Sequence, residues 1–413
     1  MSRARRCTAL CLLVAFATGF LAGCERSPAL RVTPVASPAG PGSLTPHLDR
    51  DEDGRVVLSW LEPAGELMEL KLAHSVDGAW TTPRLVARGG DWFVNWADFP
   101  SVSPIRGDVW AAHWLVRRPG GTYSYDVAVS VSQDAGIRWG DPVTPHADET
   151  PTEHGFVSLF PWGDTVGVLW LDGRETGEHN PETHSSSGGM TLRSARLAET
   201  GALLNGELVD EFVCDCCQTD VAVAADGPVA VYRDRSADEV RDVYVARTLN
   251  GAWQRGVPVA ADGWVINGCP VNGPAVAASG STVAVAWFTA ADDTPRVRAA
   301  LSSDGGATFG DAIEIDSAAP IGRVDVELLD SGAAAVSWMA AGADGQGMLS
   351  LRVFGSDGSA GPVRVITPIA AARSSGFPQM IRQGDALLFA WTALSGEDRQ
   401  VLTATLPVAA IEH

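Results

Sequence analysis

The sequence predicts an all-β chain folded as a β-propeller of four-stranded blades, with seven blades favoured and six as the alternative. Three observations predict this fold. Short apolar alternations recur about every 50 residues, as propeller blades do, and each ends in an aromatic residue. Two more short strand-like segments follow most of these aromatics. After the first 23 residues, no segment shows the 3.6-residue period of an amphipathic helix.

The aromatic residues mark the second strand of each repeat, as in Val56–Trp60 and Val283–Trp287, whose successive side chains point to opposite faces. The last repeat stops after Val401–Thr405 without a clear fourth strand, and Leu30–Pro34 is the candidate to supply it from the N-terminal side. Such closure would pair the first and last edges of the ring. The seven aromatics are Trp60, Trp114, Trp170, Tyr232, Trp287, Trp338 and Trp391.

The N-terminal segment predicts export. Arg3, Arg5 and Arg6 precede an apolar run, which ends in small residues as a signal peptide does. The quartet Leu21–Cys24 resembles the lipobox of bacterial lipoproteins, and this resemblance implies that Cys24 is lipidated. We therefore expect a signal peptide at 1–23, a lipidated tether with the closing strand at 24–45, and the propeller at 46–413. The expected location is the cell envelope, lipid-anchored and extracytoplasmic, in the outer membrane if the host is Gram-negative.

Charge restricts the partners. Without residues 1–23 the chain keeps 27 basic and 50 acidic residues, a net charge of −23. A strongly acidic surface repels phosphate backbones, so nucleic acid is not an expected partner. A glycan or an envelope protein remains possible, and the membrane is reached through the lipid on Cys24.

Two turns have the form S-x-D-x-G-x-x-aromatic, namely Ser132–Trp139 and Ser302–Phe309. With these turns and the repeat, the chain resembles the Asp-box (BNR-repeat) proteins, a group that includes the sialidases. The repeat covers nearly the whole mature chain, whereas the complete motif covers only two turns. In such turns the Asp accepts backbone hydrogen bonds and the Gly permits positive φ. The resemblance implies that these turns lie away from the active face, so Asp134 and Asp304 indicate fold rather than reaction.

The catalytic set of the sialidases is not complete in this chain. The family uses three Arg around a carboxylate, an Asp acid/base, and a Tyr nucleophile assisted by Glu. None of the four Tyr lies in the last 169 residues, where the family's nucleophile is expected. The family's Phe-Arg-Ile-Pro-type element is matched only faintly, by Leu30–Val32. Enzyme activity therefore stays open, with a sialidase-like exo-glycosidase as the activity that the resemblance implies.

Polar residues at the ends of the repeats are candidates for a site, because loops at one end of a propeller meet around its axis. They could bind an anion through Arg, or form structural salt bridges and turn caps. The catalytic candidates are Asp172, Arg174, Arg233, Asp234 and Arg235. The ligand-binding candidates are Asn95, His154, Arg174, Arg233, Arg235, Asn267 and Asn272.

The histidines favour structural roles. His113 lies inside a predicted strand and is expected to pack there. His179 and His184 lie in a loop rich in Gly, Ser and Glu, which we interpret as a solvated loop rather than a metal site.

Four cysteines of the mature part, Cys214, Cys216, Cys217 and Cys269, fall at matching places in neighbouring repeats, so they are expected on one face. Export favours disulfides, with Cys269 joined to Cys216 or Cys217 and the remaining two bridged locally. The alternatives are a thiolate site for copper or zinc, and a redox dithiol. No other cofactor is expected.

Three functions follow from these observations. The first is a membrane-tethered propeller that binds a ligand or scaffolds an envelope complex. The second is a glycoside hydrolase or lyase acting on glycans. The third is a metal-handling lipoprotein built on the four cysteines. Fold alone cannot choose among them, because one architecture serves many functions.

Overall fold

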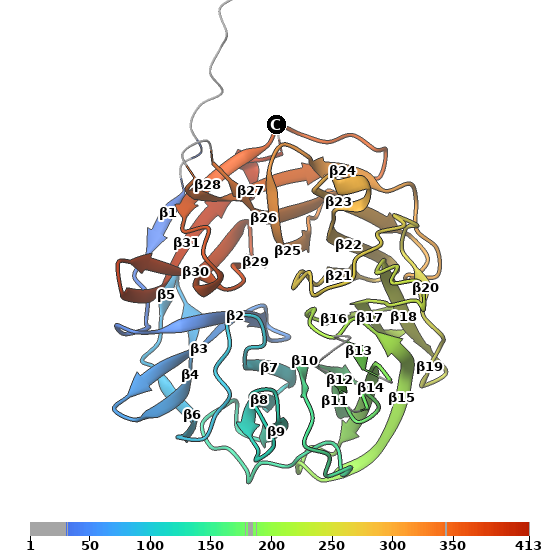
Figure 1. The fold of residues 1–413 in the computed structure, drawn as a ribbon. Helices are drawn as coiled ribbons and strands as arrows, with labels where there is room; N and C mark the ends of the chain where they lie inside the picture. Colours follow the sequence, from blue (N-terminus) through green and yellow to red (C-terminus); the bar gives the residue numbers. More distant parts are fainter. Residues whose placement is uncertain are drawn as a thin grey trace, which may run out of the picture.

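The structure is a computed structural model and describes residues 30, 32–177, 179–180, 185–186, 188–342 and 345–412. The proposed signal segment and Cys24 lie outside the described residues. The chain forms seven antiparallel blades around a central axis (Figure 1), which confirms the propeller and its seven blades. Among the described residues, no helix is long and apolar enough to span a bilayer.

Each blade runs outward from the axis through strands in chain order, except that β1 is the outer strand of the seventh blade. The innermost strands are β2 (Leu44–Arg50), β7 (Ser101–Arg106), β10 (His154–Trp162), β16 (Asp220–Ala224), β21 (Ala275–Ser279), β25 (Pro320–Leu328) and β29 (Gln379–Gln383). The second strands are β3 (Val56–Ala64), β8 (Val109–Arg117), β11 (Thr165–Asp172), β17 (Gly227–Arg233), β22 (Thr282–Thr289), β26 (Ala334–Ala341) and β30 (Ala386–Ser395). The third strands are β4 (Leu67–Val76), β9 (Tyr125–Ser132), β14 (Met190–Leu197), β18 (Val243–Leu249), β23 (Arg296–Ser302), β27 (Gly347–Phe354) and β31 (Asp398–Pro407).

The outer position varies more from blade to blade. In the second blade it is reduced to one bridge between Val129 and Val143. The outer strands are β1 (Thr33–Val35), β5 (Ala79–Trp80), β6 (Arg84–Gly89), β15 (Leu203–Val213), β19 (Ala252–Trp253), β20 (Val257–Pro258), β24 (Ile313–Asp316) and β28 (Arg364–Ile369). In the described part of the chain, the remaining elements are the hairpin β12 (His179–Asn180) with β13 (Ser185–Ser186) and three 3₁₀ turns, η1 (Ala291–Asp293), η2 (Arg373–Ser375) and η3 (Val408–Ala410).

The ring is closed by its two ends. Thr33 pairs with Thr405 and Val35 with Thr403, so β1 becomes the outer strand of the blade formed by β29, β30 and β31. This strand overlaps the candidate Leu30–Pro34 at Thr33 and Pro34. Because the first and last segments share one sheet, the seventh blade is complete only when both are present.

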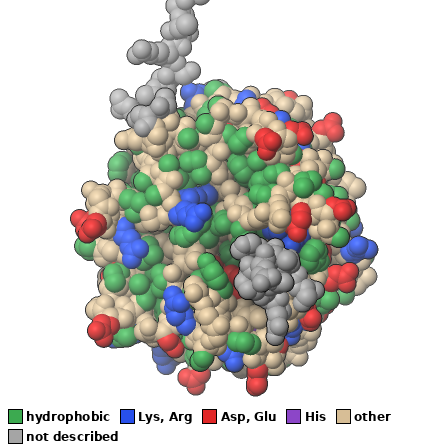
Figure 2. All heavy atoms as spheres, viewed as in Figure 1, with side chains coloured by type: hydrophobic (Ala, Val, Ile, Leu, Met, Phe, Trp, Pro, Cys, Tyr) green, Lys and Arg blue, Asp and Glu red, His purple; other side chains and the backbone are tan. Residues whose placement is uncertain are grey.

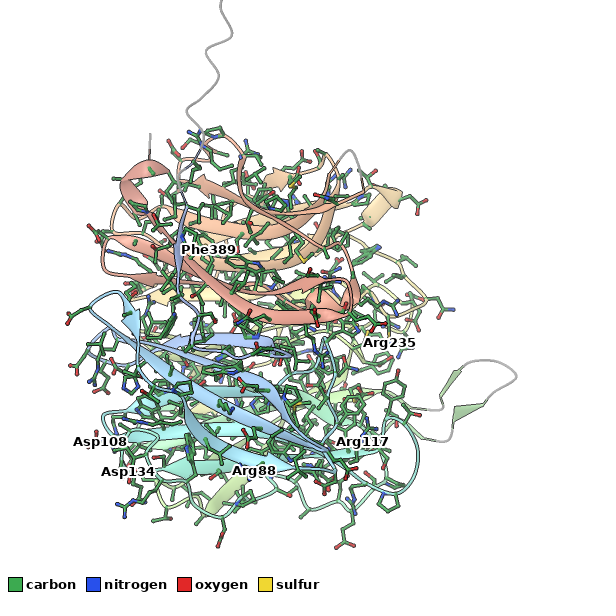
Figure 3. All side chains as sticks on the ribbon, turned by 90° about the vertical axis from the view of Figure 1, so that its left-hand side faces the viewer. Arg88, Asp108, Arg117, Asp134, Arg235 and Phe389 are labelled. Atoms are coloured by element: carbon green, nitrogen blue, oxygen red, sulfur yellow. The ribbon has the colours of Figure 1, made fainter. Side chains whose placement is uncertain are left out.

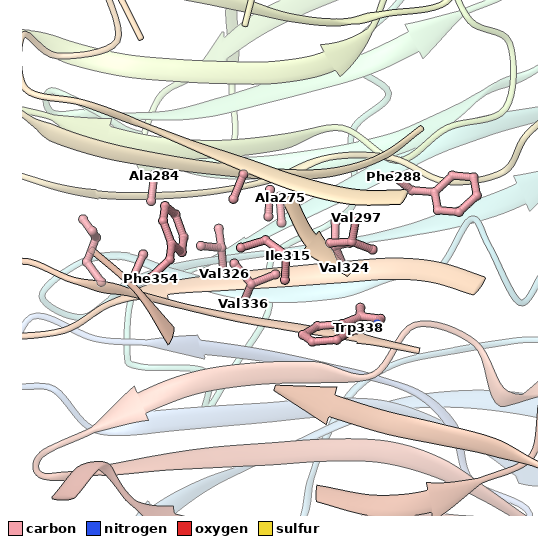
Figure 4. Packing of buried hydrophobic residues seen from close by; sticks show 14 of the residues in the cluster. Ala275, Ala284, Phe288, Val297, Ile315, Val324, Val326, Val336, Trp338 and Phe354 are labelled. Atoms are coloured by element: carbon pink, nitrogen blue, oxygen red, sulfur yellow. The ribbon is translucent and has the colours of Figure 1, made fainter. Parts of the chain in front are cut away.

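The predicted aromatics all lie in second strands and are buried between blades. Alternation in a β-strand sends one set of side chains toward each neighbouring blade, so apolar residues fill both faces of every sheet. Figure 4 shows one such layer, in which Trp338 and Val336 of one blade face Val297 and Ala284 of the next. Burial of these faces is the main force that holds the blades together.

The innermost strands surround a polar cavity of about 360 Å³ on the axis. Carboxylates on these strands bind backbone N–H groups of the neighbouring blade: Asp220 accepts from Val276 N at 2.8 Å and Asp325 from Met380 N at 2.6 Å. These bonds replace the missing sheet contacts between adjacent innermost strands. The buried acids of the cavity are thus part of the ring's construction.

The two faces of the ring carry different features. In Figure 3, Arg117 and Arg235 lie on the face at the right of the picture, called the upper face below, and Asp108 and Asp134 lie on the opposite face at the left, called the lower face. In the turn after β9, Asp134 Oδ1 accepts from Arg138 N at 2.8 Å, while Gly136, at φ 73°, donates to Ser132 Oγ. In the turn after β23, Thr308 N donates to Asp304 Oδ1 in the same way, at 2.9 Å. Both turns stabilise hairpins, as the motif predicts.

Candidate functional site

The upper face is formed by the loops that lead into the innermost strands and those that leave the second strands. Acidic side chains on this face lie mostly toward its rim (Figure 2). Near the axis, the loop before β7 reaches the loop before β29, and the rings of Trp96 and Phe377 stack with their centroids 5.9 Å apart. Phe99, Phe156, Val271 and Cys216 pack into the same apolar group.

The four cysteines converge on this face. Cys214, Cys216 and Cys217 lie between β15 and β16, and Cys269 lies before β21. All four are free thiols in the structure, and Cys214 Sγ lies 3.4 Å from Cys217 Sγ. Cys216 interacts with the other three thiols. The expectation that they share one face therefore agrees with the geometry, while the proposed disulfide pairs stay a prediction.

The ionisation of these thiols is uneven. Burial disfavours the Cys214 thiolate, but hydrogen bonds with Cys216 and Cys217 and the charges of Arg241 and Arg233 hold its pKa well below the usual value. Interaction with Cys216 lowers the pKa of Cys269. Interactions with neighbouring thiols raise the pKa of Cys216, and burial raises that of Cys217.

Charged residues surround the thiols. Arg241 Nη1 lies 3.3 Å from Cys214 Sγ, and its Nη2 pairs with Glu239 at 2.8 Å. Arg235 pairs with Glu239 at 2.6 Å and with Asp215 at 3.2 Å. The predicted residue Arg235 is thus engaged by two carboxylates beside the thiols.

Arg233 takes a structural place instead of the expected ligand-binding one. Its side chain is 2 % exposed, and it donates to the carbonyls of Asn272, Arg241 and Phe288 at 2.7–3.2 Å. Its guanidinium also lies over the ring of Trp264, 4.9 Å from the centroid. Arg233 therefore ties together three segments of the fourth and fifth blades beneath the surface.

Asp172 and Arg174 belong to a second group, in the third blade. They pair at 2.6 Å, Asp172 is fully buried, and Trp170 Nε1 donates to it at 2.7 Å. Within the described residues, this group shares no hydrogen bond or ion pair with Arg233 or Arg235. The five catalytic candidates therefore fall into two separately bonded groups, and Asp234 lies with Arg233, its amide bonded to the carbonyl of Asp242.

Two buried histidines lie beside this pair. Asp148 contacts His146 Nδ1 at 3.0 Å and His154 Nε2 at 3.1 Å, and the two imidazole rings stack at 3.9 Å with an angle of 9°. Burial and the neighbouring His154 lower the pKa of His146 to about 4. Lone pairs in parallel planes do not converge on one ion, so this stacked pair favours a hydrogen-bonded network over a metal chelate. His154, a predicted ligand residue, is therefore part of the interior.

A tyrosine between two carboxyl groups was missed by sequence reasoning. Tyr125 Oη lies within hydrogen-bond distance of both carboxyl groups, 2.7 Å from Asp98 and 2.6 Å from Glu153, and its ring stacks on Phe93 at 4.1 Å. Burial raises the pKa of Asp98 to about 7 and that of Glu153 to about 8. Burial also raises the pKa of Tyr125 well above its usual value.

The predicted asparagines divide between loop structure and surface. Asn272 Oδ1 accepts from Arg323 N at 2.8 Å, and Asn95 Oδ1 accepts from Ala97 N at 2.8 Å, so both shape loops. Asn267 is exposed. His113 is buried and bonds Ser101 Oγ at 3.0 Å, as expected of a packed strand histidine. His184 lies outside the described residues, and of His179 only the backbone is described.

Arginines that the sequence did not single out lie at the aromatic stack. Arg323 Cζ is 4.7 Å from the centroid of Trp96 and 5.8 Å from that of Phe377. Its Nη1 donates to the carbonyls of Ala372 and Gly376, and no ion pair to it is formed within the described residues. The exposed Arg373 lies 6.0 Å from the same Trp96 ring. Burial and the charge of Arg373 lower the pKa of Arg323 to about 10.

Comparisons with known proteins identify the fold. No family model matches the chain, and no curated protein matches it. Among solved structures, a lectin from Burkholderia pseudomallei is similar at a TM-score of 0.58 and 14 % identity, covering 88 % of this chain and 96 % of that one. An endosialidase of phage phi92 is similar at 0.50 and 9 %, covering 93 % and 69 %. At these identities the similarity shows a sialidase-like propeller fold alone.

Proposed function

We propose that this chain is a lipid-anchored, extracytoplasmic propeller that binds an acidic glycan on its upper face without cleaving it. The observation that carries the proposal is the group of Trp96, Phe377, Arg323 and Arg373, called the aromatic–arginine group below. Arg323 is a buried cation with no acidic partner among the described residues, and burying an unpaired charge is costly. Arg323 itself is covered, so a sugar carboxylate that lies over Trp96 and pairs with the exposed Arg373 would offset this charge without direct contact to Arg323.

The shape of this group suits a sugar acid. Trp96 is half-buried, so part of its ring is open to a ligand, while Phe377 supports it from behind. Ligand sites commonly combine such an apolar floor with a few oriented polar groups. Guanidinium groups bind carboxylates through paired, charge-assisted hydrogen bonds. The names of the two similarly folded proteins, a lectin and an endosialidase, are in keeping with a glycan ligand.

Binding is tested by titration calorimetry with N-acetylneuraminic, glucuronic and galacturonic acids and with neutral glucose and galactose. Wild type is expected to bind at least one acid and neither neutral sugar. Arg373→Ala is expected to weaken binding about 10- to 100-fold, because hydrogen bonds to charged groups are worth about 1.5–3 kcal/mol. Trp96→Ala is expected to abolish it. The matched control is Arg138→Ala, which removes an exposed arginine from the lower face. No binding of any acid by wild type, or an equal loss in the control, would refute the proposal.

Glycoside hydrolysis is the second candidate, and the Tyr125–Glu153 pair is the observation that favours it, because sialidases use a tyrosine nucleophile. The surroundings of Tyr125 oppose this role. Its side chain is fully buried and its pKa is raised, so the phenolate is neither accessible nor favoured. We expect no release of fluorophore from a panel of fluorogenic glycosides. Turnover by wild type that Glu153→Gln removes would establish cleavage and overturn a purely binding role.

The lipid anchor is part of the proposal and has its own test. Cys24 follows the small residues of the signal segment, where lipoproteins carry their lipid. Wild type is expected in the membrane fraction of expressing cells, and Cys24→Ser in the soluble extracytoplasmic fraction. Equal partitioning of the two forms would count against the anchor.

A further inference from the structure

The cysteine group, Cys214, Cys216, Cys217 and Cys269, has a geometry that neither glycan binding nor the fold requires. Three of its members come from the loop between the third and fourth blades, and the fourth from the loop between the fourth and fifth. Cys214 and Cys217 are almost completely buried, whereas Cys269 is exposed. A packing role alone would not bring three sulfur atoms of one loop within 4.8 Å of one another and place a fourth cysteine, from the neighbouring loop, beside Cys216.

The spacing of the sulfur atoms fits ligands around one ion. The Sγ atoms of Cys214, Cys216 and Cys217 all lie within 4.8 Å of one another, and the Cys214–Cys217 pair is 3.4 Å apart. Bonds of about 2.3 Å from a tetrahedral ion to sulfur would place neighbouring sulfurs about 3.8 Å apart. A disulfide would require about 2.05 Å between two sulfurs. The observed spacing lies near the first value.

The surroundings compensate the charge that bound thiolates would carry. Arg241 donates to Cys214 at 3.3 Å, and its guanidinium is also held by Glu239, which fixes its orientation. The guanidinium of Arg233 is buried nearby, without a carboxylate partner within the described residues. Hydrogen bonds and positive charge beside coordinating sulfur are the outer shell that metal sites commonly have.

We propose that Cys214, Cys216, Cys217 and Cys269 form a binding site for one thiophilic d¹⁰ metal ion, Cu(I) or Zn(II). Thiolate ligands prefer these ions over hard cations such as Mg²⁺ or Ca²⁺. Cys269 closes the site from the neighbouring blade, and its exposure leaves it as the side from which the ion enters. Cys216 packs in the same apolar cluster as Trp96 and Phe377, but no cysteine belongs to the aromatic–arginine group, so metal binding is measured independently of glycan binding.

The test uses the full chain, extracted from membranes in detergent, reduced, and kept anaerobic. The metals alone are the probes: Cu(I) is titrated in competition with bathocuproine disulfonate, and Zn(II) with 4-(2-pyridylazo)resorcinol. Each chain is expected to bind one equivalent of at least one of the two, and substitution with Co(II) should give thiolate-to-metal charge-transfer absorption. Which competition succeeds identifies the ion.

Variants distinguish a metal site from a simple cluster of thiols. Cys269→Ser, a change in an exposed loop, is expected to weaken binding at least about 100-fold, because loss of even an outer-shell partner costs about 10–100-fold. Arg241→Lys should weaken it less, through loss of the bond to Cys214. His146→Asn is the control, because it alters the buried histidine pair and leaves every cysteine in place. Circular dichroism should show the same fold in all three.

Three results would overturn the proposal. The first is that the protein has four titratable thiols but takes neither Cu(I) nor Zn(II) from its competing chelator. The second is that His146→Asn abolishes binding while Cys269→Ser does not. The third is that protein isolated without reductant contains two disulfides, and the reduced protein gives no charge-transfer band with Co(II).

Discussion

Arg233 gives the sharpest test of the internal construction of the upper face. We predict that Arg233→Met, which keeps much of the side-chain volume, strongly destabilises the chain. In the structure this guanidinium donates to three main-chain carbonyls, those of Asn272, Arg241 and Phe288. Each buried acceptor left without its donor costs about 1–3 kcal/mol.

The net loss of stability is smaller than the summed cost of three unsatisfied carbonyls, because the substitution by methionine also removes the cost of burying a charge. The cation–π contact with Trp264 is lost as well, and this is worth about 0.5–2 kcal/mol. We therefore expect a decrease in the free energy of unfolding of about 3–5 kcal/mol.

Urea unfolding followed by tryptophan fluorescence measures this change. Arg235→Ala is the matched control: Arg235 is only part-buried and pairs with Asp215 and Glu239, and partly exposed ion pairs contribute about 0–1 kcal/mol. A loss below about 1 kcal/mol for Arg233→Met, comparable to an exposed ion pair, would show that the buried carbonyls do not depend on this side chain. The structural role assigned to Arg233 would then be wrong.

Two further predictions concern ionisable groups. Burial raises the pKa of Asp98 to about 7 in the folded chain, so the folded state binds a proton that the unfolded state has lost between pH 4 and 7. Stability should therefore fall as pH rises through this window, and Asp98→Asn should flatten that decline in denaturation curves taken at each pH. Asp304 shows the opposite sign, because bonds from Thr308 lower its pKa to about 2. The stabilisation that Asp304 gives the folded state is present above pH 4 and is lost as pH falls toward 2. Asp304→Ala should therefore reduce the difference in melting temperature between pH 5 and pH 2. An unchanged difference would contradict this.

The sequence was sufficient for the blades because each repeat carries its own local signal. Trp60 and Trp338 end alternating segments, and a tryptophan on a second strand is buried between sheets wherever its blade lies in the ring. The site was less predictable. Cysteines at matching positions in neighbouring repeats could be assigned to one face, since topology fixes where loops emerge. Their distances from one another depend on loop conformations that no repeat pattern specifies.

The errors in predicting the roles of the arginines have one physical origin. Arg233 and Arg174 look alike in sequence, each at the end of a second strand, yet Arg174 pairs with a carboxylate whereas the guanidinium of Arg233 hydrogen-bonds to carbonyls. Which partner an arginine finds depends on segments distant in the sequence, such as the loop of Asn272. Arg323 was overlooked because it lies within β25, where charged residues alternate with Val324 and Val326 as they do in an ordinary half-exposed strand. The stacking of Trp96 on Phe377 joins loops about 280 residues apart, beyond any local pattern.

The three-residue pairing of β1 with β31 has a consequence for the order in which the blades fold. Thr33 pairs with Thr405, so the ring cannot close until nearly the whole chain has been synthesised. Contacts across such long stretches of sequence make folding slow. Six blades can assemble in order as the polypeptide emerges, but the seventh is a late event, and a chain cut short before residue 403 would keep two unpaired edges open to other strands.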